Sequence, residues 1–315
     1  MSRAQLDLLR HVLGAGQAAA GLPLERVRTN FDKLFARFPT LDGVDVCRSE
    51  LGGVPCETVD ARLDRSRPPE TLVVHLHGGG FVAGSSTSHR NLAGRLSRAV
   101  DGVVIVPDYR RAPEARYPAQ LEDTLAVWKT AMLQHPEQDV SWAVLSGDSA
   151  GGGLAVLAAA RLRDEAQMQP TRRRASPRQP DALLCLSPWA DYAGTTPSLD
   201  RFEKVDPLVD RPGLELMASQ YLGGRDPWDP DVTPLRADLT GLPPTLIQTG
   251  SEETLQDDAK GLAKRLRDHG VTVRLDTWQG MTHAWHLFAG RVDEAEEALH
   301  QAGEFVQGLA SGQTT

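Results

Sequence analysis

The sequence is poor in several features that mark other classes of protein. It has 3 cysteines among 315 residues, without the spacing of a zinc site, so neither a disulfide framework nor a structural zinc is expected. Lys and Arg total 34 against 42 Asp and Glu, and a net charge of −8 argues against nucleic acid as a partner. No apolar run reaches about 18 residues, so we expect no membrane span. Reduced thiols favour a cytoplasmic protein.

The remaining composition is that of a globular chain with an ample core. Hydrophobic residues make up 40% and charged residues 24%, which suits one large α/β domain with an accessory lobe. Strand-like apolar runs lie at 71–76, 103–106, 141–145, 182–186, 244–250 and 271–278, and a helix is expected at 120–134. This alternation predicts a mostly parallel sheet flanked by helices, with ligands at the carboxyl ends of the strands.

Two segments depart from this alternation. Near the N-terminus, apolar residues at helical spacing predict two amphipathic helices, one on Leu6, Leu9, Val12 and Leu13, the other on Val27, Phe31, Leu34, Phe35 and Phe38. The stretch 191–242 is dense in Pro and Asp, with one clear helix at 213–221. Both segments are expected to form a lid. We therefore divide the chain into N-terminal cap helices (1–45), a first core part (46–190), a second cap segment (191–242) and a second core part (243–315).

A candidate nucleophile stands between a predicted strand and a helix-forming run. Ser149 is flanked by Gly147 and Gly151, after the strand at 141–145 and before the helix formers at 154–162. A serine on such a sharp turn exposes its hydroxyl, and the turn needs small neighbours. Because Gly-x-Ser-x-Gly also arises by chance, the motif counts only if its partners are present.

The partners follow in a consistent order. The run Gly78-Gly79-Gly80 comes directly after a strand and bares backbone N–H groups of the kind a forming oxyanion needs. An acidic cluster with Glu252, Glu253, Asp257 and Asp258 follows the strand at 244–250, and His283 follows the strand at 271–278. Serine, acid and histidine at the carboxyl ends of strands predict acyl transfer.

Other polar residues near these motifs are open to plainer interpretations. His286 is a weaker candidate base than His283, and the two lack a third ligand that would make a metal site. We interpret His75 as a core residue and His77 and Asp148 as braces for the glycine run and the nucleophile loop. A buried polar network is expected from Asp108, Tyr109, Arg110 and Glu114. Pocket and core remain equal alternatives for Phe81, Trp189, Met217, Tyr221 and Trp285.

Several motifs together carry a family resemblance over nearly the full length. They are His77-Gly78-Gly79-Gly80-Phe81, Asp108-Tyr109-Arg110-Arg111-Ala112-Pro113-Glu114, Gly147-Asp148-Ser149-Ala150-Gly151-Gly152, Ser187-Pro188-Trp189, Tyr221-Leu222-Gly223-Gly224 and Gly280-Met281-Thr282-His283. With them the chain resembles the hormone-sensitive-lipase-like carboxylesterases, or bacterial family IV esterases. The resemblance implies an α/β-hydrolase fold with a helical cap. It also implies hydrolysis of small-molecule esters through an acyl-enzyme, without cofactor or metal. Dimers that pair through edge strands occur in similar proteins, so a second copy of this chain is a candidate partner.

The resemblance assigns roles residue by residue. It makes Ser149 the nucleophile and His283 the general base, with Gly78 shaping the turn and the backbone N–H groups of Gly79, Gly80 and Ala150 as oxyanion donors. Its register puts Glu253 where many members have the catalytic aspartate, with Glu252 and Asp257 as alternatives. Arg111 stands where the family usually has leucine, which we interpret as a surface variation.

The substrate is less well defined by the sequence. Few aromatic residues and no long apolar stripe in the cap suggest a small pocket and short- to medium-chain acyl esters. Alternative activities are those of a lactonase, amidase or deacetylase acting on a natural product, because the same triad serves each. A ligand-binding protein of the same fold is a rival, as in the plant gibberellin receptors. Those lack the catalytic histidine, whereas this chain keeps His283.

Overall fold

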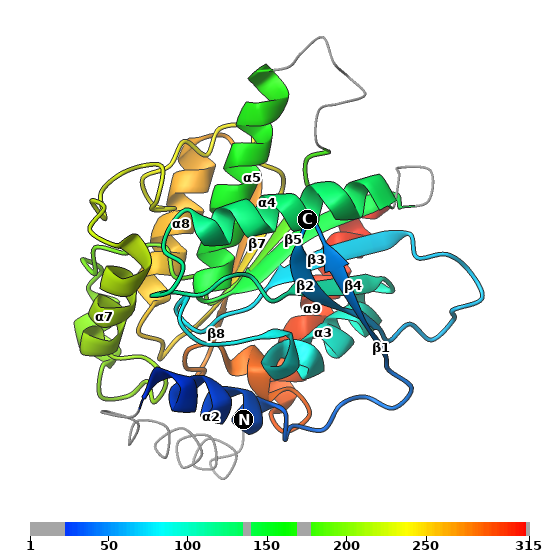
Figure 1. The fold of residues 1–315 in the computed structure, drawn as a ribbon, viewed down its shortest axis with the longest axis horizontal. Coiled ribbons are helices and arrows are strands. Elements are labelled where there is room, and N and C mark those ends of the chain that lie inside the picture. The colour runs from blue at the N-terminus through cyan, green and yellow to red at the C-terminus, as the bar shows by residue number, and fades with distance from the viewer. Residues whose placement is uncertain (1–22, 135–139, 169–177, 313–315) are drawn as a thin grey trace.

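The computed structural model describes residues 23–134, 140–168 and 178–312. Within them, eight strands form one sheet in the order β1-β2-β4-β3-β5-β6-β7-β8 (Figure 1). The strands are β1 (Asp45–Leu51), β2 (Val54–Asp60), β3 (Thr71–Leu76), β4 (Val103–Pro107), β5 (Trp142–Asp148), β6 (Ala182–Leu186), β7 (Thr245–Gly250) and β8 (Val273–Trp278). β1 and β2 pair antiparallel, as do β2 and β4, and every pairing from β4 to β8 is parallel.

Helices cover both faces of this sheet (Figure 1). They are α2 (Leu24–Phe35), α3 (Ser86–Val100), α4 (Ala119–Gln134), α5 (Ala150–Met168), α6 (Ser198–Phe202), α7 (Arg211–Leu222), α8 (Gln256–Asp268) and α9 (Asp293–Ala310), with a short 3-10 helix η1 (Trp285–Phe288). The mostly parallel sheet between helices is the α/β architecture that the alternation of strands and helices predicts, so the fold prediction is confirmed.

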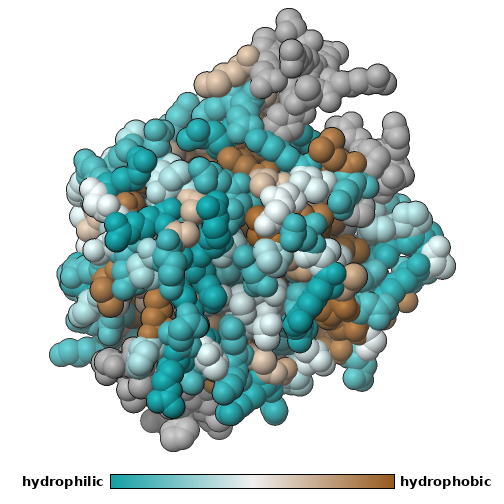
Figure 2. Space-filling model, viewed as in Figure 1, coloured by the Kyte–Doolittle hydropathy of each residue, from teal (hydrophilic) through white to brown (hydrophobic). Residues whose placement is uncertain are grey.

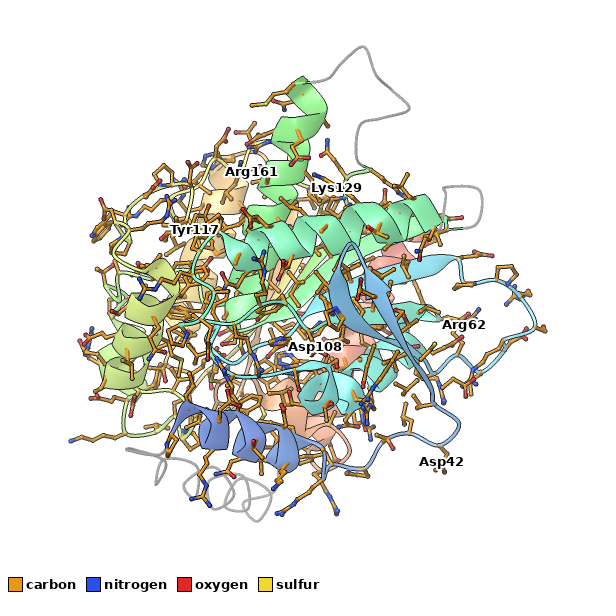
Figure 3. The ribbon with its side chains drawn as sticks, viewed as in Figure 1. Asp42, Arg62, Asp108, Tyr117, Lys129 and Arg161 are labelled. Carbon is orange, nitrogen blue, oxygen red and sulfur yellow. The ribbon has the colours of Figure 1, made fainter. Side chains whose placement is uncertain are left out.

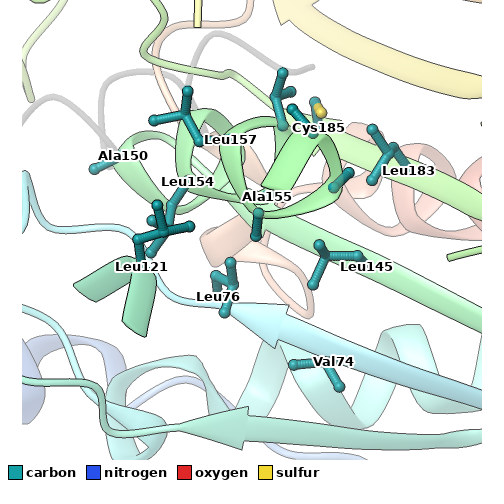
Figure 4. Close-up of a cluster of buried hydrophobic side chains, with 14 of the residues drawn as sticks. Val74, Leu76, Leu121, Leu145, Ala150, Leu154, Ala155, Leu157, Leu183 and Cys185 are labelled. Carbon is teal, nitrogen blue, oxygen red and sulfur yellow. The ribbon is translucent and has the colours of Figure 1, made fainter. Parts of the chain in front are cut away.

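The core forms on both sides of β3, because successive residues of a strand point to opposite faces. Leu72, Val74 and Leu76 pack in a cluster with α4, α5 and α8, part of which is seen in Figure 4. Val73 packs in a second cluster with residues of α3 and α9. Burial on both faces explains why β3 is an unbroken apolar run rather than an alternating one.

The element boundaries agree with the sequence in the core and depart from it in two places. The strands predicted at 71–76 and 182–186 have the same ends in β3 and β6. β5 continues through Asp148 instead of ending at residue 145, and thereby delivers the chain directly to Ser149. The helix predicted at 213–221 is α7, and the stretch 191–242 also contains the short helix α6, which the sequence analysis did not predict.

Of the two amphipathic helices predicted near the N-terminus, one lies within the described residues. The second predicted amphipathic helix is α2, which ends at Phe35, so Phe38 lies beyond it. The first, on Leu6 to Leu13, lies outside the described residues.

Apolar side chains are scattered over the visible surface rather than gathered in one large patch (Figure 2). Among the described residues, the exposed large hydrophobic side chains are Val46, Leu63, Leu133, Met168, Leu216 and Trp228. No helix in the described part of the chain has both the length and the apolar composition to cross a membrane.

Candidate active site

Ser149 occupies the turn that joins β5 to α5. Its φ of 53° lies in the left-handed region, which a non-glycine residue seldom adopts. The surrounding glycines are sterically required, because a Cβ on Gly147 would collide with the Gly151 backbone and one on Gly151 with the Leu76 carbonyl. A strained turn that holds one serine between strand and helix is typical of a nucleophile elbow.

Three predicted residues come together at the carboxyl ends of the strands. The Ser149 Oγ lies 2.8 Å from Nε2 of His283, and Nδ1 of His283 lies 2.8 Å from Oε1 of Glu253. Glu253 is fully buried, and its Oε2 accepts hydrogen bonds from three donors: the hydroxyls of Ser187 (2.9 Å) and Thr249 (3.0 Å) and the N–H of Gly250 (2.7 Å). The carboxylate is therefore fixed on one side and faces the imidazole on the other.

The alternative candidates have other contacts. Asp257 lies 3.4 Å from the guanidinium of Arg201. His286 places Nε2 3.0 Å from the side-chain oxygen of Gln248, in the interior. The Glu252 backbone N–H donates to the Met281 carbonyl at 3.0 Å. The geometry therefore favours Glu253 and His283 over these alternatives.

The imidazole of His283 lies among carboxylates that favour its protonated form. Burial by itself would lower its pKa, but the hydrogen bond and negative charge of Glu253 act against burial, and the net effect is a pKa of His283 above its ordinary value. The charges of Asp206 and Asp148 act in the same direction. An imidazole with a raised pKa accepts a proton from a hydroxyl more readily.

Asp206 is a part of this site that the sequence analysis missed. It lies between α6 and α7, is buried, and its Oδ2 accepts the backbone N–H groups of Thr254 (2.9 Å) and His283 (3.2 Å). Burial raises the pKa of Asp206. One carboxylate oxygen thus joins the loop that carries Glu253 to the loop that carries His283. It does so across 77 sequence positions and without a recognisable motif.

The glycine run separates into one structural glycine and two with open N–H groups. Gly78 donates its N–H to Oδ1 of Asp148 at 2.9 Å, and a Cβ there would collide with that carboxylate. Among the described residues, no hydrogen bond uses the N–H of Gly79 or Gly80. Ala150 is the first residue of α5, where a backbone N–H has no acceptor within the helix.

The two glycine N–H groups are oriented from the opposite side of their peptide planes. A peptide unit is planar and trans, so a hydrogen bond to its carbonyl also sets the direction of its N–H. The Gly78 carbonyl, which shares a plane with the Gly79 N–H, lies 2.8 Å from Nδ1 of His77. The Gly79 carbonyl, which shares a plane with the Gly80 N–H, accepts the Ala83 N–H at 2.9 Å.

Ala150 is oriented in the same way. The Ser149 carbonyl accepts the backbone N–H groups of Trp189 (2.9 Å) and Gly152 (3.0 Å), which turns the N–H of Ala150 to the other side of that peptide. All three backbone groups predicted as oxyanion donors are therefore held by their surroundings before any substrate binds.

Comparison with known proteins agrees with this geometry. Residues 73–287 match the family described as the α/β hydrolase fold. The chain is 35% identical to an acetyl-hydrolase of Streptomyces hygroscopicus, over 98% of this chain and 97% of the relative. It is 32% identical to an esterase of Acinetobacter venetianus, over 90% and 88% of the two chains. A solved esterase of the bacterial hormone-sensitive lipase family superposes with a TM-score of 0.88 at 34% identity and covers 98% of each chain.

The chain belongs to the α/β hydrolase family. The structural relatives place it among the bacterial hormone-sensitive-lipase-type members, so both the family and the fold implied by the motifs are confirmed.

Beneath the nucleophile turn, this α/β hydrolase has a second carboxylate in contact with histidine, Asp148, which lies between two imidazole rings. Asp148 is buried, and its oxygens lie 3.2 Å from Nε2 of His75 and 3.1 Å from Nε2 of His89. Burial opposes ionisation, but the charge of His89 and the hydrogen bonds of both rings hold the pKa of Asp148 well below its ordinary value. The bracing role predicted for Asp148 and the core position predicted for His75 are confirmed, whereas His89 was missed because no motif marks it.

The polar residues of the loop at 108–114 do not all lie in the interior as predicted. Tyr109 is buried, donates its hydroxyl to the His77 carbonyl at 2.6 Å and stacks on the His77 ring. Asp108 lies near the start of α3 (Figure 3), where it accepts the Ser86 N–H and hydroxyl. Arg110 and Glu114, however, are 54% and 60% exposed. The prediction of one buried network is wrong, because these side chains have separate partners.

Arg111 and the candidate pocket residues differ in how deeply they are buried. Arg111 is half-buried and donates to the Gly84 carbonyl at 3.0 Å. It therefore holds the chain after the glycine run and is more than the surface variation expected from the sequence. Four of the five aromatic and sulfur-containing candidates are core residues: Phe81, Trp189, Tyr221 and Trp285. Met217 of α7 is half-buried against Gly80, where a Cβ would collide with its sulfur.

Proposed function

We propose that this α/β hydrolase is a serine carboxylesterase in which Ser149 is the nucleophile, His283 the general base and Glu253 the acid. The observation that carries the proposal is the continuous line of hydrogen bonds from Glu253 through His283 to Ser149, with both distances at 2.8 Å. The acetyl-hydrolase and the esterase among the relatives of similar length support the same class of reaction.

Acylation follows from this arrangement. His283 removes the Ser149 proton as the hydroxyl attacks the ester carbonyl, and Glu253 stabilises the imidazolium that forms. The N–H groups of Gly79, Gly80 and Ala150 bind the oxyanion. One such donor contributes about 3 kcal/mol when it is preorganised. His283 then protonates the departing alcohol, which leaves the acyl group on Ser149.

Deacylation repeats these steps with water. His283 takes a proton from a water molecule that attacks the acyl carbon, and the tetrahedral intermediate uses the same three donors. Collapse of the intermediate returns the proton to Ser149 and frees the carboxylic acid. The cycle uses only this chain's own groups and water.

The substrate is a small-molecule ester with a short acyl chain. The core positions of Phe81, Trp189 and Tyr221 leave few large apolar side chains to line a long acyl tunnel. The relative from Streptomyces hygroscopicus is named an acetyl-hydrolase, which supports a short acyl group.

The surrounding organisation is also part of the proposal. Residues 1–45 and 191–242 act as a cap over Ser149, and the chain functions in the cytoplasm, where the free thiols of Cys47, Cys56 and Cys185 stay reduced. A homodimer is the partner expected from the family.

The test is hydrolysis of p-nitrophenyl acetate, butyrate, octanoate and laurate by the wild type and by Ser149→Ala, Glu253→Gln and His283→Ala. Exposed residues of the same type provide matched controls: Ser141→Ala, Glu297→Gln and His300→Ala. We expect a short-chain optimum, loss of activity in the first three variants and normal activity in the controls. An inert wild type or an active Ser149→Ala variant would contradict the mechanism, and a laurate optimum would contradict the substrate class.

A further inference from the structure

Arg28 of the N-terminal helix α2 is a buried cation attached to the loop that follows the glycine run. It is 6% exposed, its Nε–H donates to the Val82 carbonyl at 2.8 Å, and Nη2 donates to the Ala112 carbonyl at 2.9 Å. Glu25 and Glu114 each approach the guanidinium within 2.7 Å. The hydrogen bond with Glu114 helps to raise the pKa of Arg28, so the side chain remains a cation.

The Val82 carbonyl is connected to Gly80 by two peptide units. It shares a planar peptide with the Ala83 N–H, which donates to the Gly79 carbonyl at 2.9 Å. The Gly79 carbonyl in turn shares its peptide with the Gly80 N–H. A chain of hydrogen bonds therefore runs from the Arg28 guanidinium through two peptide groups to the Gly80 N–H.

We propose that Arg28 is a positioning residue for the oxyanion hole, which aims and polarises the Gly80 N–H through these two peptide units. The inference rests on the proposed role of Gly80 as an oxyanion donor. It gives the N-terminal helix a part in stabilising the transition state, beyond covering the site.

The effect travels through hydrogen bonds and not through the long-range field of the cation. Glu25 and Glu114 carry two negative charges against the single positive charge of the guanidinium, so this group of residues exerts no net positive field at the active site. A charged donor nevertheless makes a stronger hydrogen bond than a neutral one, and successive hydrogen bonds in a chain polarise one another. The Gly80 N–H gains both direction and acidity from this arrangement.

The other two donors are held differently. The Gly79 N–H is set by His77, whose pKa is lowered by burial to about 3, so that ring is neutral. The Ala150 N–H is set by backbone groups alone. Among the described residues, a cation begins the hydrogen-bond chain to Gly80 but not those to Gly79 and Ala150, so loss of Arg28 weakens one donor and leaves two intact.

The test compares Arg28→Met with Arg110→Met, the same change at an exposed arginine that pairs with Asp123. Reactive serines are counted with a fluorophosphonate. We then measure kcat and KM for p-nitrophenyl acetate and the affinity of phenylboronic acid, whose tetrahedral adduct mimics the intermediate. For Arg28→Met we expect kcat per reactive serine to fall about tenfold, less than the roughly 10²- to 10³-fold loss for removal of a whole donor. KM should change little, and boronate affinity should fall in parallel with kcat. Arg110→Met should match the wild type.

A purely structural role would give a different pattern. If Arg28 only anchors α2, Arg28→Met lowers the thermal midpoint and the number of reactive serines, while kcat per serine and boronate affinity stay at wild-type values. That result would overturn the inference. Glu114→Gln removes an ion pair but keeps the bond to Val82, so it should retain most of kcat.

Arg28→Lys keeps the inference testable if Arg28→Met does not fold. Lysine lacks the fork that reaches the Val82 and Ala112 carbonyls together, so an intermediate kcat per serine is expected. A lysine variant with wild-type kcat and boronate affinity would contradict the role of the guanidinium. A wild type that neither hydrolyses the ester nor binds the boronate would overturn the proposed function itself, and this inference with it.

Discussion

Two clusters of histidine and carboxylate lie close together in this molecule and differ in what their imidazole rings contact. In the lower cluster, Asp148 contacts His75 and His89 beneath the nucleophile turn. In the upper cluster, Glu253 contacts His283, which contacts Ser149. Both carboxylates are buried, and each also accepts a backbone N–H, so residue type and burial do not distinguish the two.

The difference is in the second nitrogen of each imidazole. Both ring nitrogens of His75 contact buried groups, one Asp148 and the other the Ser146 hydroxyl at 3.0 Å. Burial lowers the pKa of His75. His283 gives one nitrogen to Glu253 and turns the other to a hydroxyl at the edge of the interior, since Ser149 is 9% exposed. Under the proposed mechanism, His283 can act as the base because its second nitrogen reaches a hydroxyl that substrate can approach, whereas both nitrogens of His75 are engaged in the interior.

The largest expected effects separate His283 from His75. His283→Ala should lower kcat by about 10⁴-fold or more with the fold intact, because the nucleophile loses its base. His75→Ala should instead cost about 2 to 3 kcal/mol of unfolding free energy, because it leaves buried partners unpaired. Denaturant unfolding measures the loss of stability, and kcat per folded enzyme measures the loss of activity. A His75 variant that folds normally but has lost activity would place both histidines in the chemistry and break the comparison.

The carboxylates should separate in the same way with a smaller loss. Glu253→Gln should lower kcat by about 10³- to 10⁴-fold, because an amide no longer holds the imidazole in its reactive tautomer or stabilises the imidazolium. Asp148→Asn should lower stability by about 2 to 3 kcal/mol through its weakened bonds to Gly78 and the two histidines, with a far smaller fall in kcat. Equal losses of kcat in the two variants would argue against a division of roles.

The pH profile sharpens the comparison further. The pKa of His283 is raised above its ordinary value of 6.5, so the imidazolium is still the main form at pH 6.5. Since acylation needs the neutral ring, kcat/KM in the wild type should rise with pH through a pKa above 6.5. In Glu253→Gln the main raising influence is gone while burial remains, so the rise should move to lower pH. A rise that stays in place would show that the titrating group is not His283.

The sequence revealed the parts of this site that local patterns encode. Ser149 was found because its turn demands glycines on both sides, and β3 and β6 because a strand buried on both faces is an unbroken apolar run. Glu253 came from a motif register. Asp206 and His89 could not be found in this way, because their contacts exist only after distant segments fold together. α6, with 5 residues, is too short to show a helical period.

Asp206 offers the smallest and most specific test, because it touches the upper cluster only through backbone groups and charge. Asp206→Asn keeps an acceptor for the N–H groups of Thr254 and His283 but removes one negative charge that favours the imidazolium. We expect kcat to fall several-fold and the rise of kcat/KM to move to lower pH, less far than in Glu253→Gln, because Glu253 bonds the ring directly.

The matched control for this last comparison is Asp210→Asn, the same change at a carboxylate of the same segment that caps α7 through the Gly213 N–H. Its pH profile should superimpose on that of the wild type, since it has no contact with the His283 loop among the described hydrogen bonds. If Asp206→Asn and Asp210→Asn have the same profile, Asp206 holds the backbone without tuning the base. The pKa of His283 would then be raised without a contribution from Asp206.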